Sequence, residues 1–394
     1  MSTLTATANS PATRLKVNCA GEPREMGRIQ GETLRDKIIA ARAALARLEA
    51  FRLDQPWWMP FGAYRWFAER TAHNVLAEPL ARDFPALHER LAGIAAGAGL
   101  NLQSLYLMNA LEPLLSRVRG GTVVPSLGAC TAVAVSAARS GIGEPIVAKN
   151  FDYLPLVQPF YTMRESRPRD RLRSLDFTVA PLAGAIDGLN EAGLCITNNY
   201  AYTTDVAAPS GTISMVITEA LERCATVGEA ADWIKSRPRW GAGLLMLADA
   251  AGDMASLELS STRASVRRPA SGGDLLFHTN KFACPEMREV EVDKSAVFTD
   301  RAPKPLRGRR VQLSAETRDA RLAELLGRAG PLGPDELATI LSDHGPDHTP
   351  GDFTLCVHSA YWNTTACLQF LPKSRRVRVD FGNACQARYE DVVL

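Results

Sequence analysis

The sequence lacks several features that would place it in a large class of proteins. No apolar run approaches the roughly 20 residues of a transmembrane helix, so we expect no membrane partner. The 45 basic residues nearly balance the 43 acidic ones, and a formal charge of +2 is far from the strongly basic character of nucleic-acid-binding proteins. A small-molecule substrate fits this composition better than a nucleic acid.

The cysteines lack a spacing pattern as well. The 8 cysteines include no CxxC pair, which argues against a zinc knuckle or a dense disulfide framework. The segment from Met1 to Ala20 lacks the continuous apolar stretch of a signal peptide, and we therefore expect a cytoplasmic protein. Most of the cysteines are expected to be small buried hydrophobes, so a catalytic cysteine needs an argument of its own.

What is present is a change of pattern along the chain. Good helix formers fill 23–52, 62–97 and 102–117, and Gly and Pro then predict a flexible loop over 119–128. Later segments are typical of strands or helices, which together predict an α+β layered fold. The predicted strands are 131–135, 146–151, 175–179 and 194–200, with further candidates near Leu244, Ala255, Leu275, Thr354, Cys367 and Val377. The predicted later helices are 213–235, 314–328 and 334–341, and the Arg-rich stretch 164–173 is predicted to be a solvated loop.

Cys130 stands where the Gly-containing loop meets the first predicted strand, so its sulfur can be exposed at a strand start. The next strand ends in an Asn-x-Asp-aromatic motif, and a hairpin between the two strands would bring Asp152 near Cys130. A Gly-rich turn then precedes a strand that carries Asn198 and Asn199, and a later strand is followed by Asn280. A buried structural cysteine is the alternative for Cys130 alone.

In this order, the motifs resemble the acyl-coenzyme A:isopenicillin N acyltransferase family and, more distantly, choloylglycine hydrolase and N-acylethanolamine acid amidase. The ranges 21–27 and 91–99 look like that family's prosegment. The resemblance implies an α+β fold, the four-layer αββα sandwich of N-terminal nucleophile (Ntn) hydrolases, made by self-cleavage between Ala129 and Cys130. Residues 1–129 would form a helical small chain and 130–394 the catalytic domain, and the two fragments would stay associated.

The resemblance also implies roles for the site residues. Cys130 would be the nucleophile, and its freed α-amine, with an ordinary pKa of about 8, would be the general base. Asp152 would hold that amine. Asn199, or its neighbour Asn198, and Asn280 would donate to the developing oxyanion. No cofactor and no catalytic metal are then expected, and the substrate would be an N-acyl amide or another acyl donor.

Other positions match less closely. Arg318 matches a late active-site arginine of the bile-salt enzymes, with a surface position on a helix as the alternative. Lys149 stands where those enzymes have an arginine, and it keeps the charge but not the bidentate fork. Ideal strand alternation puts Lys149 and Asp152 on opposite faces, so we expect a bulge or bend if both reach the site. Ala129 precedes the nucleophile where a glycine or another small residue is usual.

Three other interpretations remain open. A metal-dependent hydrolase is suggested by the spacing of Asp343, His344, Asp347 and His348, although Gly345 and the nearby prolines disfavour a helix there. A catalytically silent protein of the same fold is the second. The third is a papain-like enzyme, which would pair Cys130 with one of the 6 histidines, namely His73, His88, His278, His344, His348 or His358.

Overall fold

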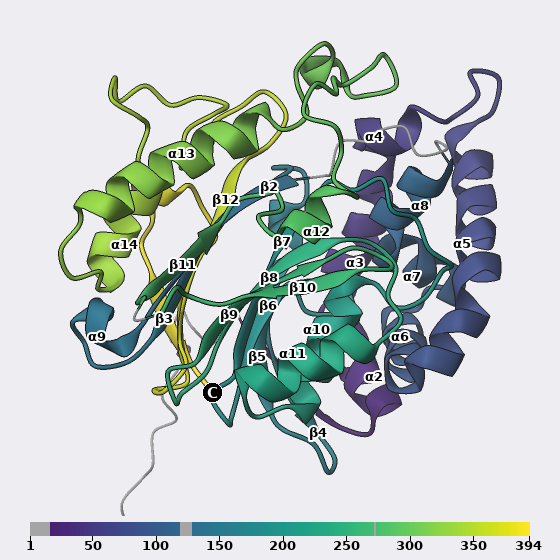
Figure 1. Cartoon of the computed structure of the whole chain (residues 1–394). Helices are drawn as coiled ribbons and strands as arrows, with labels where there is room; N and C mark the ends of the chain where they lie inside the picture. Colours follow the sequence, from purple (N-terminus) through teal and green to yellow (C-terminus); the bar gives the residue numbers. More distant parts are fainter. Residues whose placement is uncertain (1–15, 119–127, 272) are drawn as a thin grey trace, which may run out of the picture.

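Two β-sheets stacked face to face form the centre of the molecule (Figure 1). The computed structural model describes residues 16–118, 128–271 and 273–394. The 8-stranded sheet has the order β1 (Lys16–Gly21), β4 (Tyr161–Pro168), β5 (Ser174–Val179), β6 (Asp187–Asn190), β7 (Cys195–Tyr200), β8 (Gly243–Ala248), β9 (Met254–Leu259) and β10 (Ala264–Arg267). The 6-stranded sheet has the order β11 (Leu275–His278), β2 (Gly128–Val135), β3 (Ile146–Tyr153), β12 (Asn363–Leu371), β13 (Arg376–Asp380) and β14 (Glu390–Val393).

Helices cover both outer faces of this sandwich, which gives the predicted αββα layers (Figure 1). On the smaller sheet lie α13 (Leu313–Arg328) and α14 (Pro334–Leu341), and on the larger sheet lie α10 (Ile213–Arg223) and α11 (Val227–Ser236). The N-terminal helices are α2 (Pro23–Thr33), α3 (Arg35–Ala44), α4 (Glu49–Arg52), α5 (Phe61–Asp83), α6 (Pro85–Ala98), α7 (Leu102–Asn109) and α8 (Leu111–Val118). Short helices are α9 (Ala137–Ser140) and α12 (Pro285–Arg288), with 3-10 turns at Leu45–Arg47, Gln158–Phe160, Lys304–Leu306 and Ala384–Gln386.

Strand β2 is buried on both faces, which its small and β-branched residues allow. Its side chains alternate between two parts of the core. Ala132 and Ala134 belong to the central cluster between the sheets, whereas Val133 and Val135 pack with leucines of α13 and α14. Cys130, two residues before Ala132, therefore shares the inner face of the sheet.

Helices α2 and α6 touch through glycines. A Cβ atom on Gly27 would lie 2.1 Å from a backbone oxygen of α6, and one on Gly93 would lie 2.0 Å from a backbone oxygen of α2. The same holds one turn later, at Gly31 and Gly97, with distances of 2.4 and 2.3 Å. Only glycine permits backbones to approach this closely. This contact joins the two segments that the sequence analysis had identified as prosegment-like.

Most predicted elements are confirmed, some with altered bounds. The helical first third is confirmed as a series of shorter helices, and the predicted helix 334–341 coincides with α14. The predicted helix 213–235 is two helices, because the chain is extended at Cys224 and Thr226. The loop predicted over 119–128 lies outside the described residues except for Gly128, which begins β2. Of the polar start, only the part from Lys16 onward is described.

Two predictions about local structure were wrong. The Arg-rich stretch is not a solvated loop throughout, because β4 runs to Pro168 and Arg164 is fully buried in an ion pair of 3.1 Å with Asp176. The strand predicted near Thr354 is a turn, in which the Thr354 hydroxyl bonds to backbone oxygens of Gly351 and Cys356.

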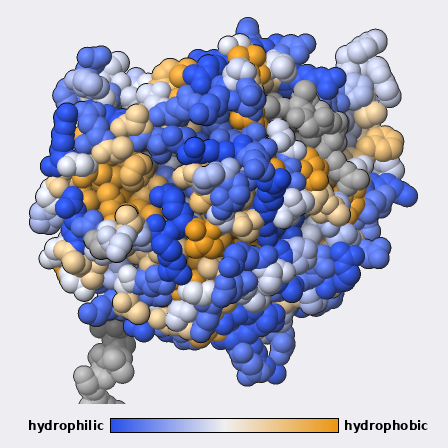
Figure 2. Space-filling view, viewed as in Figure 1, coloured by the Kyte–Doolittle hydropathy of each residue, from blue (hydrophilic) through white to orange (hydrophobic). Residues whose placement is uncertain are grey.

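The surface of the protein is mostly hydrophilic. Hydrophilic residues cover most of the face seen in Figure 2, and hydrophobic ones gather in small areas between them. Within the described ranges, no helix has both the length and the apolar character needed to cross a membrane.

Candidate active site

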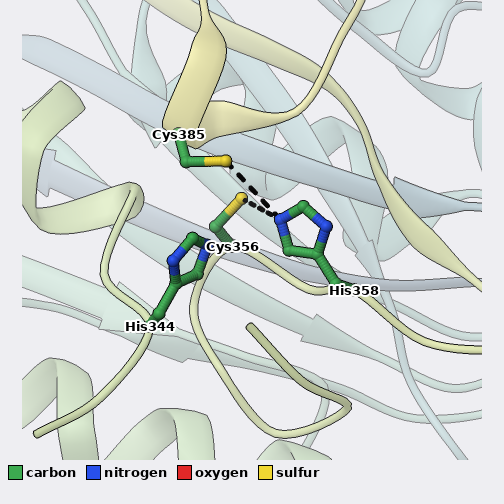
Figure 3. Close-up of side chains that lie close together, drawn as sticks. All are labelled: His344, Cys356, His358 and Cys385. Atoms are coloured by element: carbon green, nitrogen blue, oxygen red, sulfur yellow. Dashed lines mark hydrogen bonds between the residues drawn. The ribbon is translucent and has the colours of Figure 1, made fainter. Parts of the chain in front are cut away.

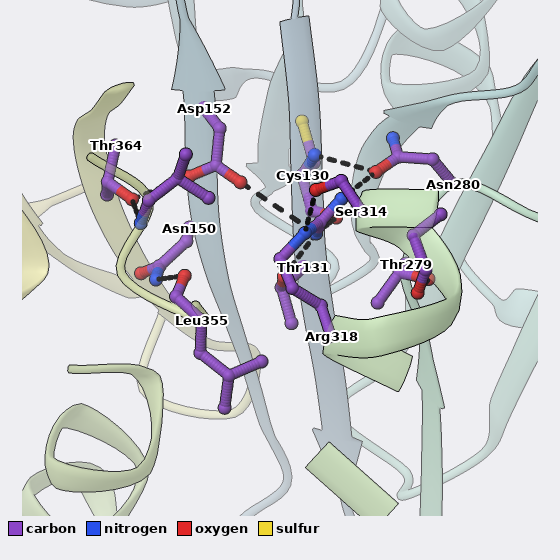
Figure 4. Close-up of polar contacts among 12 residues, drawn as sticks. Cys130, Thr131, Asn150, Asp152, Thr279, Asn280, Ser314, Arg318, Leu355 and Thr364 are labelled. Carbon is purple, nitrogen blue, oxygen red and sulfur yellow. Dashed lines mark hydrogen bonds and ion pairs between the residues drawn. The ribbon is translucent and has the colours of Figure 1, made fainter. Parts of the chain in front are cut away.

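Cys130 is the third residue of β2 and pairs with Phe151 of β3. It is 3% exposed, and both of its backbone polar groups are held by side chains from distant segments (Figure 4). Its N–H donates to Asn280 Oδ1 at 3.0 Å, and its carbonyl oxygen accepts from Arg318 Nη1 at 2.6 Å. The peptide units on either side of Cys130 are therefore fixed by residues that follow it by more than a hundred positions.

Arg318 of α13 connects these groups. Besides the Cys130 carbonyl, its guanidinium donates to Thr131 Oγ1 and to Asn280 Oδ1, each at 2.7 Å. Its Nη1 atom also lies 3.8 Å from Asp152 Oδ2. The side chain is 1% exposed. The alternative of a surface position is therefore wrong, because the guanidinium faces the sheet beneath Cys130 (Figure 4).

Asp152 of β3 lies opposite Ala129 in the β2–β3 pairing, next to the peptide bond that precedes Cys130. Its Oδ1 atom accepts from Thr364 Oγ1 at 2.7 Å, whereas Oδ2 accepts no hydrogen bond from a described residue. Burial raises the pKa of Asp152 to about 6, although Arg318 and the Thr364 hydrogen bond oppose this shift. One carboxylate oxygen of Asp152 thus remains as an acceptor close to Cys130.

Lys149 approaches from the other face of the same sheet. Its Nζ atom donates to Asp187 Oδ1 at 2.6 Å and to the carbonyl of Asn198 at 2.5 Å, and the side chain is fully buried. The β2–β3 register runs without a shift, so Lys149 and Asp152 lie on opposite faces and no bulge between β2 and β3 brings them together. The register shift in this region falls instead in β12, between Thr364 and Ala366.

The charges around Cys130 have opposing effects on the pKa of its thiol. Burial raises the pKa of the Cys130 thiol to about 12, and the Lys149 ammonium acts in the other direction. The nearby carboxylates of Asp152 and Asp187 raise this pKa further. The Cys130 thiol is therefore protonated at neutral pH.

The asparagines are arranged differently from the sequence-based expectation. Asn199 is fully buried, and its amide donates to the carbonyl of Thr279 at 2.8 Å. The amide of Asn280 donates to the carbonyl of Tyr200 at 2.9 Å, while its oxygen accepts from Cys130. Asn198, the rival to Asn199, lines the same cavity as Cys130. The structure thus brings Asn198 to the cavity, and Asn280 to the backbone nitrogen of Cys130.

A cavity of about 270 Å³ opens beside Cys130. Its lining is mainly apolar and comes from segments far apart in the chain, with Leu45 and Met108 from the helical first third and Trp240 from the connection between α11 and β8. Among the described lining residues, the acidic ones are Glu112 and Asp205, and none is basic. Such a lining suits an apolar group and offers no cation for an anionic one.

Neither the metal site suggested by the spacing of Asp343 to His348 nor a pair of Cys130 with a histidine is assembled in the described ranges of the structure. Asp343 forms an ion pair of 2.7 Å with Arg321 and caps the turn at Gly345, so it is not directed at a metal with its neighbours. His348 is exposed, with a φ of 52°, so the predicted Asp343–His348 cluster does not form. Among the described residues, none of the histidines hydrogen-bonds to Cys130, and the buried His278 bonds to Ser256 at 3.0 Å. A Cys–His pair therefore has no support in the geometry.

Comparison with known proteins identifies the family of the chain. Residues 139–385 match the family model described as acyl-coenzyme A:6-aminopenicillanic acid acyl-transferase, which is more than half of the chain. The chain belongs to this family. The resemblance inferred from the sequence is thereby confirmed, and membership of the acyl-transferase family supports an enzyme that hydrolyses or transfers acyl groups at amide bonds. The matched range includes Lys149, Asp152, Asn280 and Arg318 and begins after Cys130.

Solved structures give more distant similarities. An N-acylethanolamine-hydrolyzing acid amidase ortholog from Caenorhabditis elegans is 17% identical, covering 62% of this chain and 93% of that chain, with a TM-score of 0.41. A mutant conjugated bile acid hydrolase from Clostridium perfringens is 13% identical, covering 67% and 97%, with a TM-score of 0.39. Penicillin V acylase from Agrobacterium tumefaciens is 12% identical, covering 67% and 86%, with a TM-score of 0.37. No curated protein sequence matches the chain.

Sequence analysis missed three residues of this site. Asp187 anchors Lys149, Thr364 bonds to Asp152, and Thr131 accepts from Arg318. Asp187 directly precedes the Gly-rich motif, so of the three it was the easiest to identify from the sequence. A threonine within a strand carries no comparable signal, because Thr is common in strands.

Proposed function

We propose that the protein is a self-processing cysteine enzyme that cleaves, or transfers the acyl group of, a linear amide through a thioester on Cys130. The observation that carries the proposal is the set of contacts around this residue. Asn280 holds its nitrogen, Arg318 holds its carbonyl and Asp152 faces the preceding peptide, all beside an apolar cavity. A merely structural cysteine needs none of these contacts.

The first reaction would be cleavage of the chain itself. The sulfur of Cys130 adds to the carbonyl carbon of Ala129, and the bond from this carbon to the Cys130 nitrogen breaks as that nitrogen takes up a proton. The result is a thioester of Ala129 and a free α-amine. Water then hydrolyses the thioester, which leaves a carboxylate on Ala129 and regenerates the thiol. Residues 1–129 become the small chain and 130–394 the catalytic chain.

The freed amine would then act as the general base. Its ordinary pKa of about 8 is close enough to neutral pH for the amine to take the thiol proton. Two acceptors are in place to orient it, since Asn280 Oδ1 already accepts from the Cys130 nitrogen and Asp152 Oδ2 has no hydrogen-bond donor among the described residues. Lys149 and Arg318 supply positive charge on the two faces of the sheet. Neither a metal nor a cofactor takes part.

In turnover, the thiolate would attack the substrate's amide carbonyl, and the leaving amine would receive the proton. Asn198, which lines the cavity, is our candidate for donating a hydrogen bond to the oxyanion. The apolar lining favours an apolar acyl group. Water or a second amine would then release the acyl group from sulfur. The family's name does not assign penicillin chemistry to this chain.

Intact-mass spectrometry combined with a substrate panel tests the proposal. Purified protein is incubated with N-acyl amino acids, N-acylethanolamines, conjugated bile acids and β-lactams. We expect two fragments that co-purify, turnover of at least one class, and a transient acyl adduct on the fragment that begins with Cys130. An active protein that stays a single chain would refute self-processing. A single inactive chain would favour the catalytically silent member of the fold.

A further inference from the structure

Four metal-binding side chains converge on a place that the reaction above does not use (Figure 3). His344 follows α14, Cys356 and His358 precede β12, and Cys385 lies in the 3-10 turn at Ala384–Gln386. One potential ligand atom from each residue lies within 4.8 Å of the others. The Nε2 atom of His358 is 3.3 Å from the sulfur of Cys356 and 3.6 Å from that of Cys385.

We propose that these four residues bind one structural zinc ion. Two sulfurs and two imidazoles are a ligand set that Zn²⁺ takes in closed tetrahedral sites, in which no position is left for water or substrate. A separation of under 5 Å between ligand atoms is compatible with metal–ligand bonds of about 2.0–2.3 Å after small side-chain adjustments. The ion would thus stabilise the fold and would not take part in the chemistry at Cys130.

A second observation supports a ligand at this place. The Nε2 atom of His344 is buried and has no hydrogen-bond partner among the described residues, although buried polar atoms are nearly always satisfied. Its ring lies 5.1 Å from that of His358, centroid to centroid, at 74°. A metal ion would provide the partner that His344 lacks.

The ion would fasten three segments that contain little regular structure. It would join the turn after α14, the segment 356–358 and the stretch after β13. Val357, between two of the ligands, donates its N–H to Thr364 Oγ1 at 2.8 Å, and Thr364 in turn donates to Asp152 at 2.7 Å. The proposed zinc site thus lies two hydrogen bonds from the carboxylate beside the nucleophile.

Metal analysis of the full chain tests the proposal. Protein produced with added zinc and purified under reducing conditions without chelator should contain one zinc per chain. Removal of the zinc should lower the melting temperature of the protein. The metal-free protein should then bind one equivalent of Co²⁺ with a thiolate-to-cobalt absorption band. Cys356→Ser and His358→Ala should each lose stoichiometric zinc. His348→Ala is the matched control, since His348 belongs to the same loop but is exposed and outside the cluster.

The wild-type result decides the matter if a variant fails to fold. Wild-type protein that holds no stoichiometric zinc, and takes up neither zinc nor cobalt after reduction, would overturn the proposal. So would a disulfide between Cys356 and Cys385 found by peptide mapping of the metal-free protein as isolated. These readouts are independent of turnover. An inactive protein that still holds one zinc would therefore count against the proposed function alone.

Discussion

Arg318 donates a hydrogen bond of 2.6 Å to the carbonyl oxygen of Cys130, a residue 188 positions earlier in the chain. The same guanidinium bonds to Asn280, which accepts from the Cys130 nitrogen. A buried guanidinium needs several acceptors to offset its loss of water, and here those acceptors are parts of the candidate site. The packing of α13 and the position of Cys130 are therefore linked.

Replacing this arginine by lysine should impair self-cleavage. Arg318→Lys keeps the charge but loses the fork that reaches Cys130, Thr131 and Asn280 at once. We expect the rate at which fragments appear to fall by roughly tenfold or more, measured by intact mass on freshly purified precursor. Arg328→Lys, at the exposed end of the same helix, is the control. Equal cleavage rates in the two variants would show that Arg318 only stabilises the fold.

Cys130→Ala should remain one uncut, inactive chain, and Cys130→Ser should cleave slowly, because a hydroxyl is a weaker nucleophile than a thiol. Cys224→Ala, at a buried cysteine outside the cavity, should cleave normally. N-terminal sequencing of the second fragment locates the cut. A fragment that begins anywhere other than Cys130 would contradict the assignment of the nucleophile.

Asn198→Ala should lower turnover by roughly a hundredfold, the usual effect of losing an oxyanion donor. Asn199→Ala should instead mainly lower stability, by about 1–3 kcal/mol, because it leaves buried backbone carbonyls without a donor. Steady-state kinetics and chemical unfolding of both variants separate the two effects. The reverse pattern would assign the catalytic role to Asn199, as the sequence alone suggested.

Asp152 should make cleavage depend on pH. Its folded-state pKa of about 6 lies above the ordinary value of 3.8, so the carboxylate loses its charge as the pH falls through 6. We expect cleavage to slow below this pH, and Asp152→Asn to be slow throughout. The stability effect has the opposite sign: because the folded state binds the proton more tightly, this group's contribution is full below about pH 4 and is lost as the pH rises through 6. A cleavage rate that is flat from pH 5 to 7, roughly one unit on either side of this pKa, would contradict the assignment.

Gly93→Ala should destabilise the protein by about 1–3 kcal/mol or more, because the new methyl group meets the backbone of α2 at 2.0 Å. Gly62→Ala is the matched control, since nothing lies within 4 Å of its Cβ position in α5. That control should be neutral or stabilising by up to about 1 kcal/mol. Thermal unfolding of both variants tests the comparison, and similar midpoints would mean that the two helices can move apart without loss.

The features that could be predicted from the sequence are those with local signals. The strand at Cys130, the hairpin to Asp152 and the helix 334–341 each depend on neighbouring residues, and each was found. The buried position of Arg164 could not be predicted, because an Arg-rich stretch is normally solvated and its partner Asp176 is identified only by strand pairing.

Contacts between distant segments could not be derived from local patterns, and Arg318 entered the candidate site only through the family resemblance. Arg318 faces Cys130 because α13 packs on the smaller sheet, and no periodicity in the sequence encodes that choice. Which of Asn198 and Asn199 lines the cavity depends on the register of β7, because a shift of one residue exchanges the faces on which the two side chains lie. The cluster around His358 draws on three separate segments, so no motif indicated it.

The cavity is shared between the two parts of the chain that a cut after Ala129 would separate. Leu45 and Met108 belong to the first part, whereas Cys130 and the residues that hold it belong to the second. If the proposed cleavage occurs, both fragments would line the acyl-binding cavity, whereas the reacting thiol would belong to the second fragment alone. Exchanging the first part for that of a relative would then alter one wall of the cavity and leave the groups around Cys130 in place, so we expect acyl preference to shift without loss of the reaction.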